Sequence, residues 1–79
     1  MEGEGRLVWR CRRGMRELDA LLTRYLKTRY LLAGAVERQA FESTLELTDP
    51  ELWAFVLGQA VPSDPAMRHV IEQIADPRA

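Results

Sequence analysis

Gly14 separates two stretches of this 79-residue chain in which apolar residues recur with helical spacing. Recurrence at i, i+3, i+4 and i+7 places apolar side chains on one face of a helix. Glycine adopts the left-handed conformation of a tight helix end without steric cost, and its missing side chain lets another surface approach the backbone. We therefore predict that one helix stops at Gly14 and that the next starts there. The apolar positions are Leu7, Val8 and Cys11 before the glycine and Leu18, Leu21, Leu22, Tyr25 and Leu26 after it.

Two Asp-Pro dipeptides predict the starts of the last two helices. They are Asp49-Pro50 and Asp64-Pro65. Aspartate is a favoured N-cap residue, and proline is favoured at the first helical position. Around the first dipeptide a capping box from Thr48 to Glu51 is an equally good start signal, so the sequence leaves the identity of the cap open. A helix begins there under either interpretation.

The remaining apolar pattern is also helical. The stretch 15–30 reads as one long amphipathic helix, and Ala33-Gly34 ends it. Apolar residues surround the helix after Pro50, so we expect it to be the central and most buried one. No segment alternates long enough to be a strand, and the predicted fold class is all-α: a small single-domain bundle of about five helices. One shared core is predicted from Leu18, Leu22, Phe41, Leu45, Trp53, Val56, Val70 and Ile71.

Length and composition limit the class of protein. A chain of this size forms one domain that buries roughly 60% of its unfolded surface. With 47% apolar and 29% charged residues it is too apolar to be disordered. No apolar run is long enough to span a bilayer, and the acidic N-terminus is unlike a targeting peptide. We expect a monomer in the bacterial cytoplasm with no membrane insertion, organised as a flexible tail (1–5), a helical domain (6–75) and a C-terminal tail (76–79).

The formal net charge of -1 hides an uneven distribution. Residues 1–40 carry a net charge of +4 and residues 41–79 a net charge of -5. Nucleic acid is nevertheless disfavoured as a partner, because phosphate binding depends on cations and Glu17 and Asp19 interrupt the basic cluster. A protein surface fits better, since arginine and the neighbouring Trp9 are strong interface anchors. The basic cluster consists of Arg10, Arg12, Arg13 and Arg16.

Residues with catalytic or cofactor-binding chemistry are few. His69 is the only histidine, and its nearest carboxylate along the same helix is Glu72, at the spacing of an ordinary surface pair. Cys11 is the only cysteine, so it forms no internal disulfide, and we expect a half-buried apolar residue there. No glycine-rich loop follows a strand. We expect no catalytic residue, no metal site and no cofactor, FAD included, bound by this chain alone.

Two blocks of sequence resemble a known family. The segment Trp9-Arg10-Cys11-Arg12-Arg13-Gly14-Met15-Arg16-Glu17-Leu18-Asp19 resembles the RGxxE signature of the succinate dehydrogenase flavinylation factors, called SdhE in bacteria and also antitoxin CptB. Leu45-Glu46-Leu47-Thr48-Asp49-Pro50-Glu51-Leu52-Trp53 is similar to the family's second block, and the distance between the blocks fits. The resemblance covers residues 6–75. It is weakest at 30–36, where the family often carries a polar, acidic helix start and this chain has Leu31-Leu32-Ala33-Gly34.

The resemblance implies a non-enzymatic assembly factor. Such a protein binds the flavoprotein subunit of succinate dehydrogenase, or of fumarate reductase, and promotes covalent attachment of FAD to a histidine of that subunit. Its contribution would be to bind the attachment-competent arrangement more tightly than other arrangements. The signature falls on Arg13 and Glu17 as polar contacts and on Gly14 as the point of close approach. The resemblance also implies that the residues around these contacts take part in the surface: Trp9, Arg10, Met15, Arg16 and Asp19.

Two alternatives stay open at this point. For the site, the alternative is that Gly14 only caps a helix. Arg13 and Glu17 would then form an exposed ion pair that contributes well under about 1 kcal/mol to the stability of the fold. For the function, the second name of the family suggests an interaction protein that neutralises a toxin. Both functions are binding functions, so the chemistry of the residues does not separate them.

Overall fold

The computed structural model describes residues 2–76, with side chains from residue 5 onward. Within this range the chain forms five α-helices, one short 3₁₀ turn and no strand, which confirms the all-α prediction. In chain order they are α1 (Glu2–Arg10), α2 (Arg16–Thr28), η1 (Tyr30–Leu32), α3 (Ala35–Thr44), α4 (Asp49–Val56) and α5 (Pro65–Ala75).

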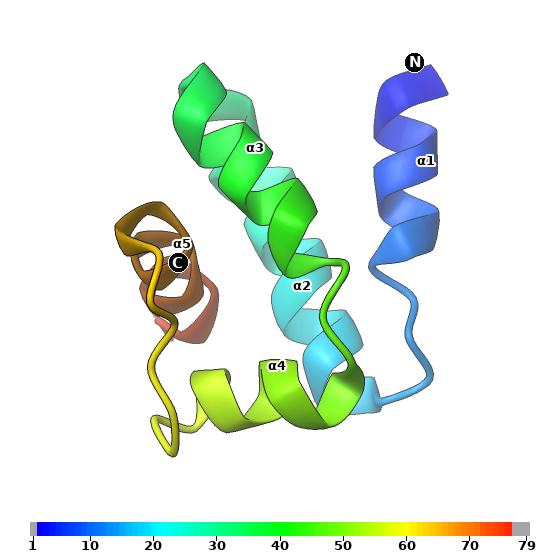
Figure 1. Ribbon diagram of the computed structural model, residues 1–79. Coiled ribbons are helices and arrows are strands. Elements are labelled where there is room, and N and C mark those ends of the chain that lie inside the picture. The colour runs from blue at the N-terminus through cyan, green and yellow to red at the C-terminus, as the bar shows by residue number, and fades with distance from the viewer. Residues whose placement is uncertain (1, 77–79) are drawn as a thin grey trace.

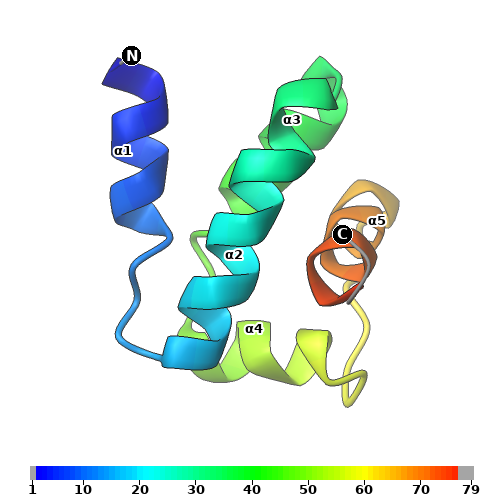
Figure 2. The same cartoon turned by 180° about the vertical axis from the view of Figure 1, so that it is seen from behind.

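The helices surround one core (Figure 1). α2 and α3 overlap in the two views and pack together through the rings of Tyr25 and Phe41, α1 lies along one side of α2, and α4 crosses the lower end of the bundle (Figures 1 and 2). α5 closes the other side and contacts α2, α3 and α4. The linker between α1 and α2, residues 11–15, therefore lies at the same end of the molecule as α4 (Figure 2).

The core is built from the apolar stripes of these helices. Phe41 of α3 is its centre, because the ring stacks on Tyr25 with centroids 4.6 Å apart and meets Tyr30 at 5.6 Å. Offset aromatic pairs of this kind stabilise a core beyond the area they bury. Most of the predicted core is confirmed as buried: Leu18, Leu22, Phe41, Leu45, Val70 and Ile71. Trp53 and Val56 are only partly buried.

The expectation that the helix after Pro50 is the central one is wrong. In α4 only Leu52 is fully buried, while Phe55 is partly buried and Leu57, just after the helix, is 50% exposed. α4 is short and lies across the end of the bundle, so one side meets the core and the other sides face outward (Figure 1). Apolar residues on every side of a helix do not by themselves place it at the centre.

The helix starts resolve the ambiguity at the first Asp-Pro dipeptide. Thr48 is the N-cap of α4: its Oγ1 accepts from the Glu51 N–H at 3.3 Å, and Glu51 Oε1 accepts from the Thr48 N–H at 3.0 Å. The bond from the Thr48 N–H, together with one that the Thr48 hydroxyl donates to the same Oε1 at 2.9 Å, holds the pKa of the Glu51 carboxyl below its usual value. Asp49 is thus the first helical residue and its side chain is available for another partner. Asp64 caps α5, with its Oδ1 accepting from the Ala66 N–H at 3.1 Å.

α1 begins at Glu2, within the segment 1–5 that we expected to be a flexible tail. At the other end Asp76 follows α5, and residues 77–79 of the expected C-terminal tail lie outside the described residues. Among the helices of the described part, none combines the length and the apolar character needed to cross a membrane.

Candidate functional site

Gly14 lies in the linker between α1 and α2, not at the end of α1. The last turn of α1 closes earlier, where the Cys11 N–H donates to the Leu7 carbonyl at 3.0 Å. Gly14 has a φ of +95°, which confirms the left-handed conformation and corrects its place, since α2 starts only after Met15. A Cβ built at Gly14 meets no heavy atom within 4 Å. The position is therefore restricted by its backbone conformation and is open on its outer side.

Arg13 points inward and holds the linker against the opposite part of the fold. Its Nε donates to Asp49 Oδ1 at 2.5 Å, and its side chain is only 13% exposed. Nη1 donates to the Leu45 carbonyl at 2.7 Å, and Nη2 donates to the Leu47 carbonyl. The guanidinium thus joins the linker to the connection between α3 and α4. Within the described residues Arg13 pairs with Asp49 and not with Glu17, so the exposed Arg13–Glu17 pair considered above does not form.

Asp19 fixes the same linker from the first turn of α2. Its Oδ1 accepts from the backbone N–H of Arg13 at 2.8 Å. The side chain of Arg13 and the carboxylate of Asp19 therefore hold the linker from two sides. Sequence reasoning missed Asp49, which was considered only as a helix cap. The signal for its second role was the presence of a capping box one residue earlier, which leaves its carboxylate free to pair.

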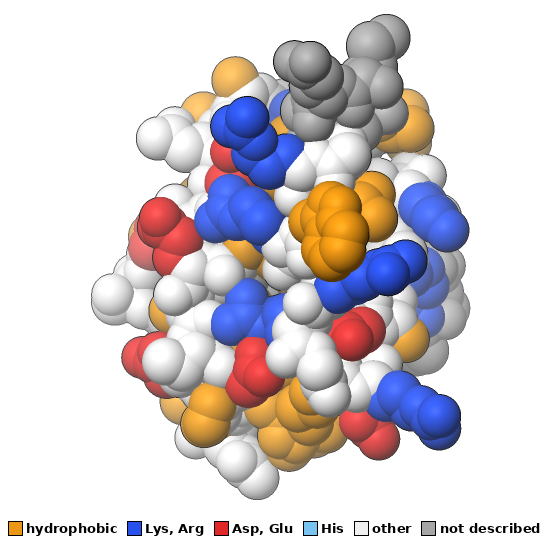
Figure 3. Space-filling view, turned by 90° about the vertical axis from the view of Figure 1, so that its right-hand side faces the viewer, with side chains coloured by type: hydrophobic (Ala, Val, Ile, Leu, Met, Phe, Trp, Pro, Cys, Tyr) orange, Lys and Arg blue, Asp and Glu red, His pale blue; other side chains and the backbone are white. Residues whose placement is uncertain are grey.

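The exposed residues of the predicted site, together with Arg12, which the prediction did not include, form an outward-facing surface. We call the exposed residues Trp9, Arg12, Gly14, Arg16 and Glu17 the linker face. The Trp9 side chain is 73% exposed, with the Arg12 guanidinium 5.7 Å from the ring centroid, a cation–π arrangement. Figure 3 shows basic groups around apolar ones on the side of the molecule that carries α1.

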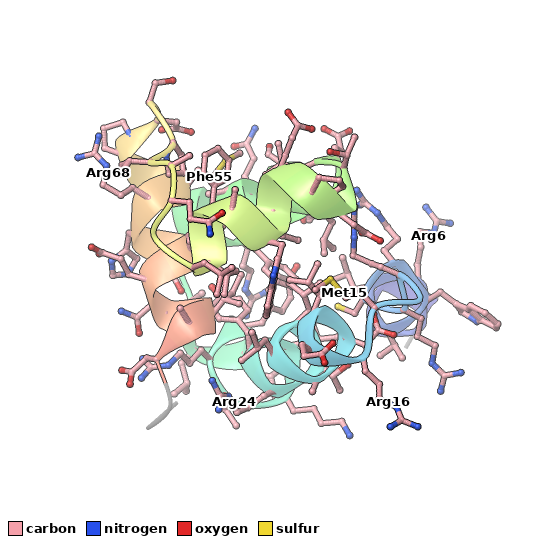
Figure 4. All side chains as sticks on the ribbon, turned by 90° about the horizontal axis from the view of Figure 1, so that it is seen from below. Arg6, Met15, Arg16, Arg24, Phe55 and Arg68 are labelled. Carbon is pink, nitrogen blue, oxygen red and sulfur yellow. The ribbon has the colours of Figure 1, made fainter. Side chains whose placement is uncertain are left out.

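Two further predicted residues border this surface. Met15 is partly buried and packs against the core, and Figure 4 shows its side chain between the helices while Arg16 points outward. Arg10 is partly buried, and its Nη2 donates to the Glu42 carbonyl at 3.2 Å. Both help to anchor the ends of the linker to the rest of the fold.

Cys11 is more buried than expected. Its side chain is fully buried at the start of the linker. Burial raises the pKa of the Cys11 thiol to about 11, and the neighbouring Arg10 only partly offsets this effect. The thiol is therefore neutral near pH 7, which agrees with a packing role.

His69 has a different partner from the one expected. Its Nε2 lies 3.2 Å from Oε1 of Glu37 on α3, so the pair is not with Glu72 of its own helix. Glu37 Oε2 also accepts from the Tyr25 hydroxyl at 2.5 Å, and burial together with this bond raises the pKa of the Tyr25 phenol. The three side chains tie α2, α3 and α5 together. Among the described side chains, those of residues 5–76, the His, Cys, Asp and Glu groups form no cluster able to hold a metal ion.

Comparison with known proteins gives a consistent result. The family described as "Flavinator of succinate dehydrogenase" matches residues 5–78. Three similar relatives are proteins named FAD assembly factor SdhE. That of Methylococcus capsulatus is 51% identical over 67 residues, covering 85% of this chain and 81% of the relative. That of Xylella fastidiosa is 42% identical over 69 residues (87% and 71%), and that of Psychrobacter arcticus is 36% identical over 69 residues (87% and 74%). No solved structure matches the chain. Because the family match covers nearly all of its residues, the chain belongs to the family of succinate dehydrogenase flavinators.

Proposed function

We propose that this chain is an assembly factor that binds the flavoprotein subunit of succinate dehydrogenase and promotes covalent attachment of FAD to it. The observation that carries the proposal is the match of residues 5–78 to the flavinator family. The relatives reported above are all named FAD assembly factors, which favours this function over a toxin-neutralising one. The related flavoprotein of fumarate reductase is a second client of the same kind.

The linker face is the proposed contact surface. Gly14 gives the partner access to bare backbone, and Arg16 and Glu17 supply exposed charges in the first turn of α2. Trp9 adds an exposed aromatic anchor. Arg13 and Asp19 act behind this surface, because their hydrogen bonds fix the linker in the shape that exposes Gly14.

The contribution of this chain is binding and not bond formation. A helper that binds one arrangement of the flavoprotein more tightly than the others raises the population of that arrangement. The groups that form the bond to FAD then belong to the flavoprotein, and this chain binds no cofactor by itself. We propose that it acts as a monomer in the bacterial cytoplasm.

A capture experiment tests the proposal. The tagged chain is mixed with purified flavoprotein subunit, and the bound subunit is quantified for the parent, for Glu17→Lys and for Glu72→Lys. Glu72 is an exposed glutamate on α5, outside the linker face, so its reversal is a control with the same change of charge. We expect capture by the parent and by Glu72→Lys and none by Glu17→Lys. Absence of capture by the parent would refute the proposed function, and equal capture by all three would refute the assigned surface.

A further inference from the structure

A shallow groove runs from the linker along the outer side of α2. Its volume is about 740 Å³, and its lining includes the small residues Gly14, Ala20 and Thr23. Ala20 and Thr23 lie at neighbouring positions on one face of the helix. A polypeptide backbone therefore has room to approach α2 closely along this line. We call this feature the α2 groove.

Three of the seven residues that line the α2 groove are cationic. Arg12 lies at the linker end, and Arg24 and Lys27 lie toward the end of α2. Figure 4 shows Arg24 along the same edge of α2 as Arg16. Among side chains of residues 5–76, none of these three has a carboxylate within 4.0 Å.

Two charged groups in the groove are already oriented. The guanidinium of Arg24 donates from Nη2 to the carbonyls of Asp76 at 2.6 Å and Ile74 at 3.2 Å, so its place is fixed by the end of α5. Asp19 is the acidic residue of the lining, and its Oδ1 is engaged by the N–H of Arg13. The lining thus holds three cationic side chains and one carboxylate, and that carboxylate already has a hydrogen-bond donor.

The spacing of the cations indicates the shape of a ligand. At about 1.5 Å per residue, the part of α2 that lines the groove, from Asp19 to Lys27, spans about 12 Å. An extended peptide covers that distance with about four residues at about 3.3 Å each. We propose that the α2 groove binds an acidic, extended segment of the partner polypeptide, with carboxylates near Arg12 at one end and near Arg24 and Lys27 at the other.

A peptide fits the groove better than a nucleic acid. A phosphate chain carries a negative charge at every step, including the step opposite Asp19, whereas a peptide can place a neutral residue there. The whole chain also has a formal net charge of -1, which weakens binding driven by phosphate neutralisation. This inference rests on the proposed function for the identity of the partner, because the groove continues from Gly14 of the linker face.

The test uses two binding partners and a matched control. A dye-labelled oligoglutamate peptide, and separately the purified flavoprotein subunit, are titrated with the parent, Arg12→Glu, Lys27→Glu and Arg68→Glu at low and at moderate salt. Arg12 and Lys27 are exposed, so their reversal leaves the fold intact, and circular dichroism checks this. Arg68 is an exposed arginine on α5, away from the groove, and gives the same change of charge. An oligothymidylate of equal charge is titrated as a comparison.

The expected result is saturable peptide binding by the parent that weakens with salt, and about a tenfold loss for Arg12→Glu and for Lys27→Glu at low salt. Arg68→Glu keeps the affinity of the parent. The same two losses are expected with the flavoprotein subunit. Equal binding by the parent and both groove variants, or tighter binding of oligothymidylate than of the peptide, would overturn the inference.

The two proposals fail in distinguishable ways. If the flavoprotein subunit binds the parent but not Glu17→Lys, and reversal of Arg12 or Lys27 changes nothing, the proposed function holds and the groove is refuted. If the subunit does not bind the parent while the peptide binds through the groove residues, the proposed function is refuted and the acidic ligand class is supported.

Discussion

Replacement of Arg13 by alanine is predicted to destabilise the fold strongly. The change removes one charged hydrogen bond to Asp49 and two to the carbonyls of Leu45 and Leu47. A hydrogen bond to a charged group contributes about 1.5–3 kcal/mol, and the three are not additive. The carboxylate of Asp49 is 36% exposed, so water replaces part of what it loses.

We therefore expect Arg13→Ala to lower the free energy of unfolding by about 2–4 kcal/mol. A domain of this size has a total stability of about 4–12 kcal/mol, so the loss is a large fraction of it. At about 4–8 °C per kcal/mol the midpoint of thermal unfolding falls by about 8–32 °C. Arg13→Lys retains the charge but not the planar guanidinium with its several N–H donors. Its free energy of unfolding is expected to lie between that of the parent and that of the alanine variant.

The assay is urea and thermal unfolding followed by circular dichroism, with Arg16→Ala as the control. Arg16 is a neighbouring arginine that is exposed, so its loss is expected to change stability by less than about 0.5 kcal/mol. Asp49→Asn and the double variant with Arg13→Ala complete a double-mutant cycle. The coupling free energy between positions 13 and 49 then measures the contribution of the Arg13–Asp49 pair. A loss for Arg13→Ala no larger than that for Arg16→Ala would show that Arg13 does not hold the linker.

Three further predictions concern other residues of the site. Gly14→Ala forces a side chain into a left-handed backbone and is expected to cost about 1–2 kcal/mol, measured by the same unfolding assays; an unchanged midpoint would contradict the observed φ of +95°. Because the pKa of the Cys11 thiol is raised from 9.0 to about 11, the folded protein gains stability from the neutral thiol below pH 9 and loses it as pH rises toward 11. A thiol reagent at pH 8 is thus expected to react far more slowly with the folded than with the urea-unfolded protein, and equal rates would contradict burial. His69→Gln breaks a pair whose histidine side chain is 55% exposed and is expected to cost under about 1 kcal/mol with flavinylation unchanged; loss of flavinylation in the folded variant would show a role for His69 in chemistry.

The helices could be predicted because their signals are local. The stripe of α2 and the two Asp-Pro starts lie within a few residues of the structure they specify, and apolar positions such as Leu22 and Ile71 were correctly placed in the core. The position of α4 could not be obtained in this way. A helix with apolar residues on all sides has no single face that shows which side meets the core.

The roles within the site required tertiary contacts. Arg13 and Asp49 are 36 residues apart, and no local pattern shows that they meet. In the sequence Arg13 stands in a run of basic residues, so an exposed contact was the natural expectation. Glu17 and Gly14, by contrast, are exposed where the sequence suggested, and their role in partner binding stays a prediction.

The central claim is that the linker face promotes FAD attachment to a partner. The flavoprotein subunit is produced in cells without its own assembly factor, together with the parent chain, with Glu17→Lys, with Glu72→Lys or with no added chain. Covalent flavin per subunit is then measured by fluorescence after denaturing electrophoresis. Glu17→Lys should remain folded, because a carboxylate in a first turn contributes only about 0.3–1 kcal/mol to the helix. We predict covalent flavin with the parent and with Glu72→Lys, and only background flavin with Glu17→Lys or with no added chain. Full flavinylation with Glu17→Lys, or equal flavinylation with and without the parent, would contradict the account.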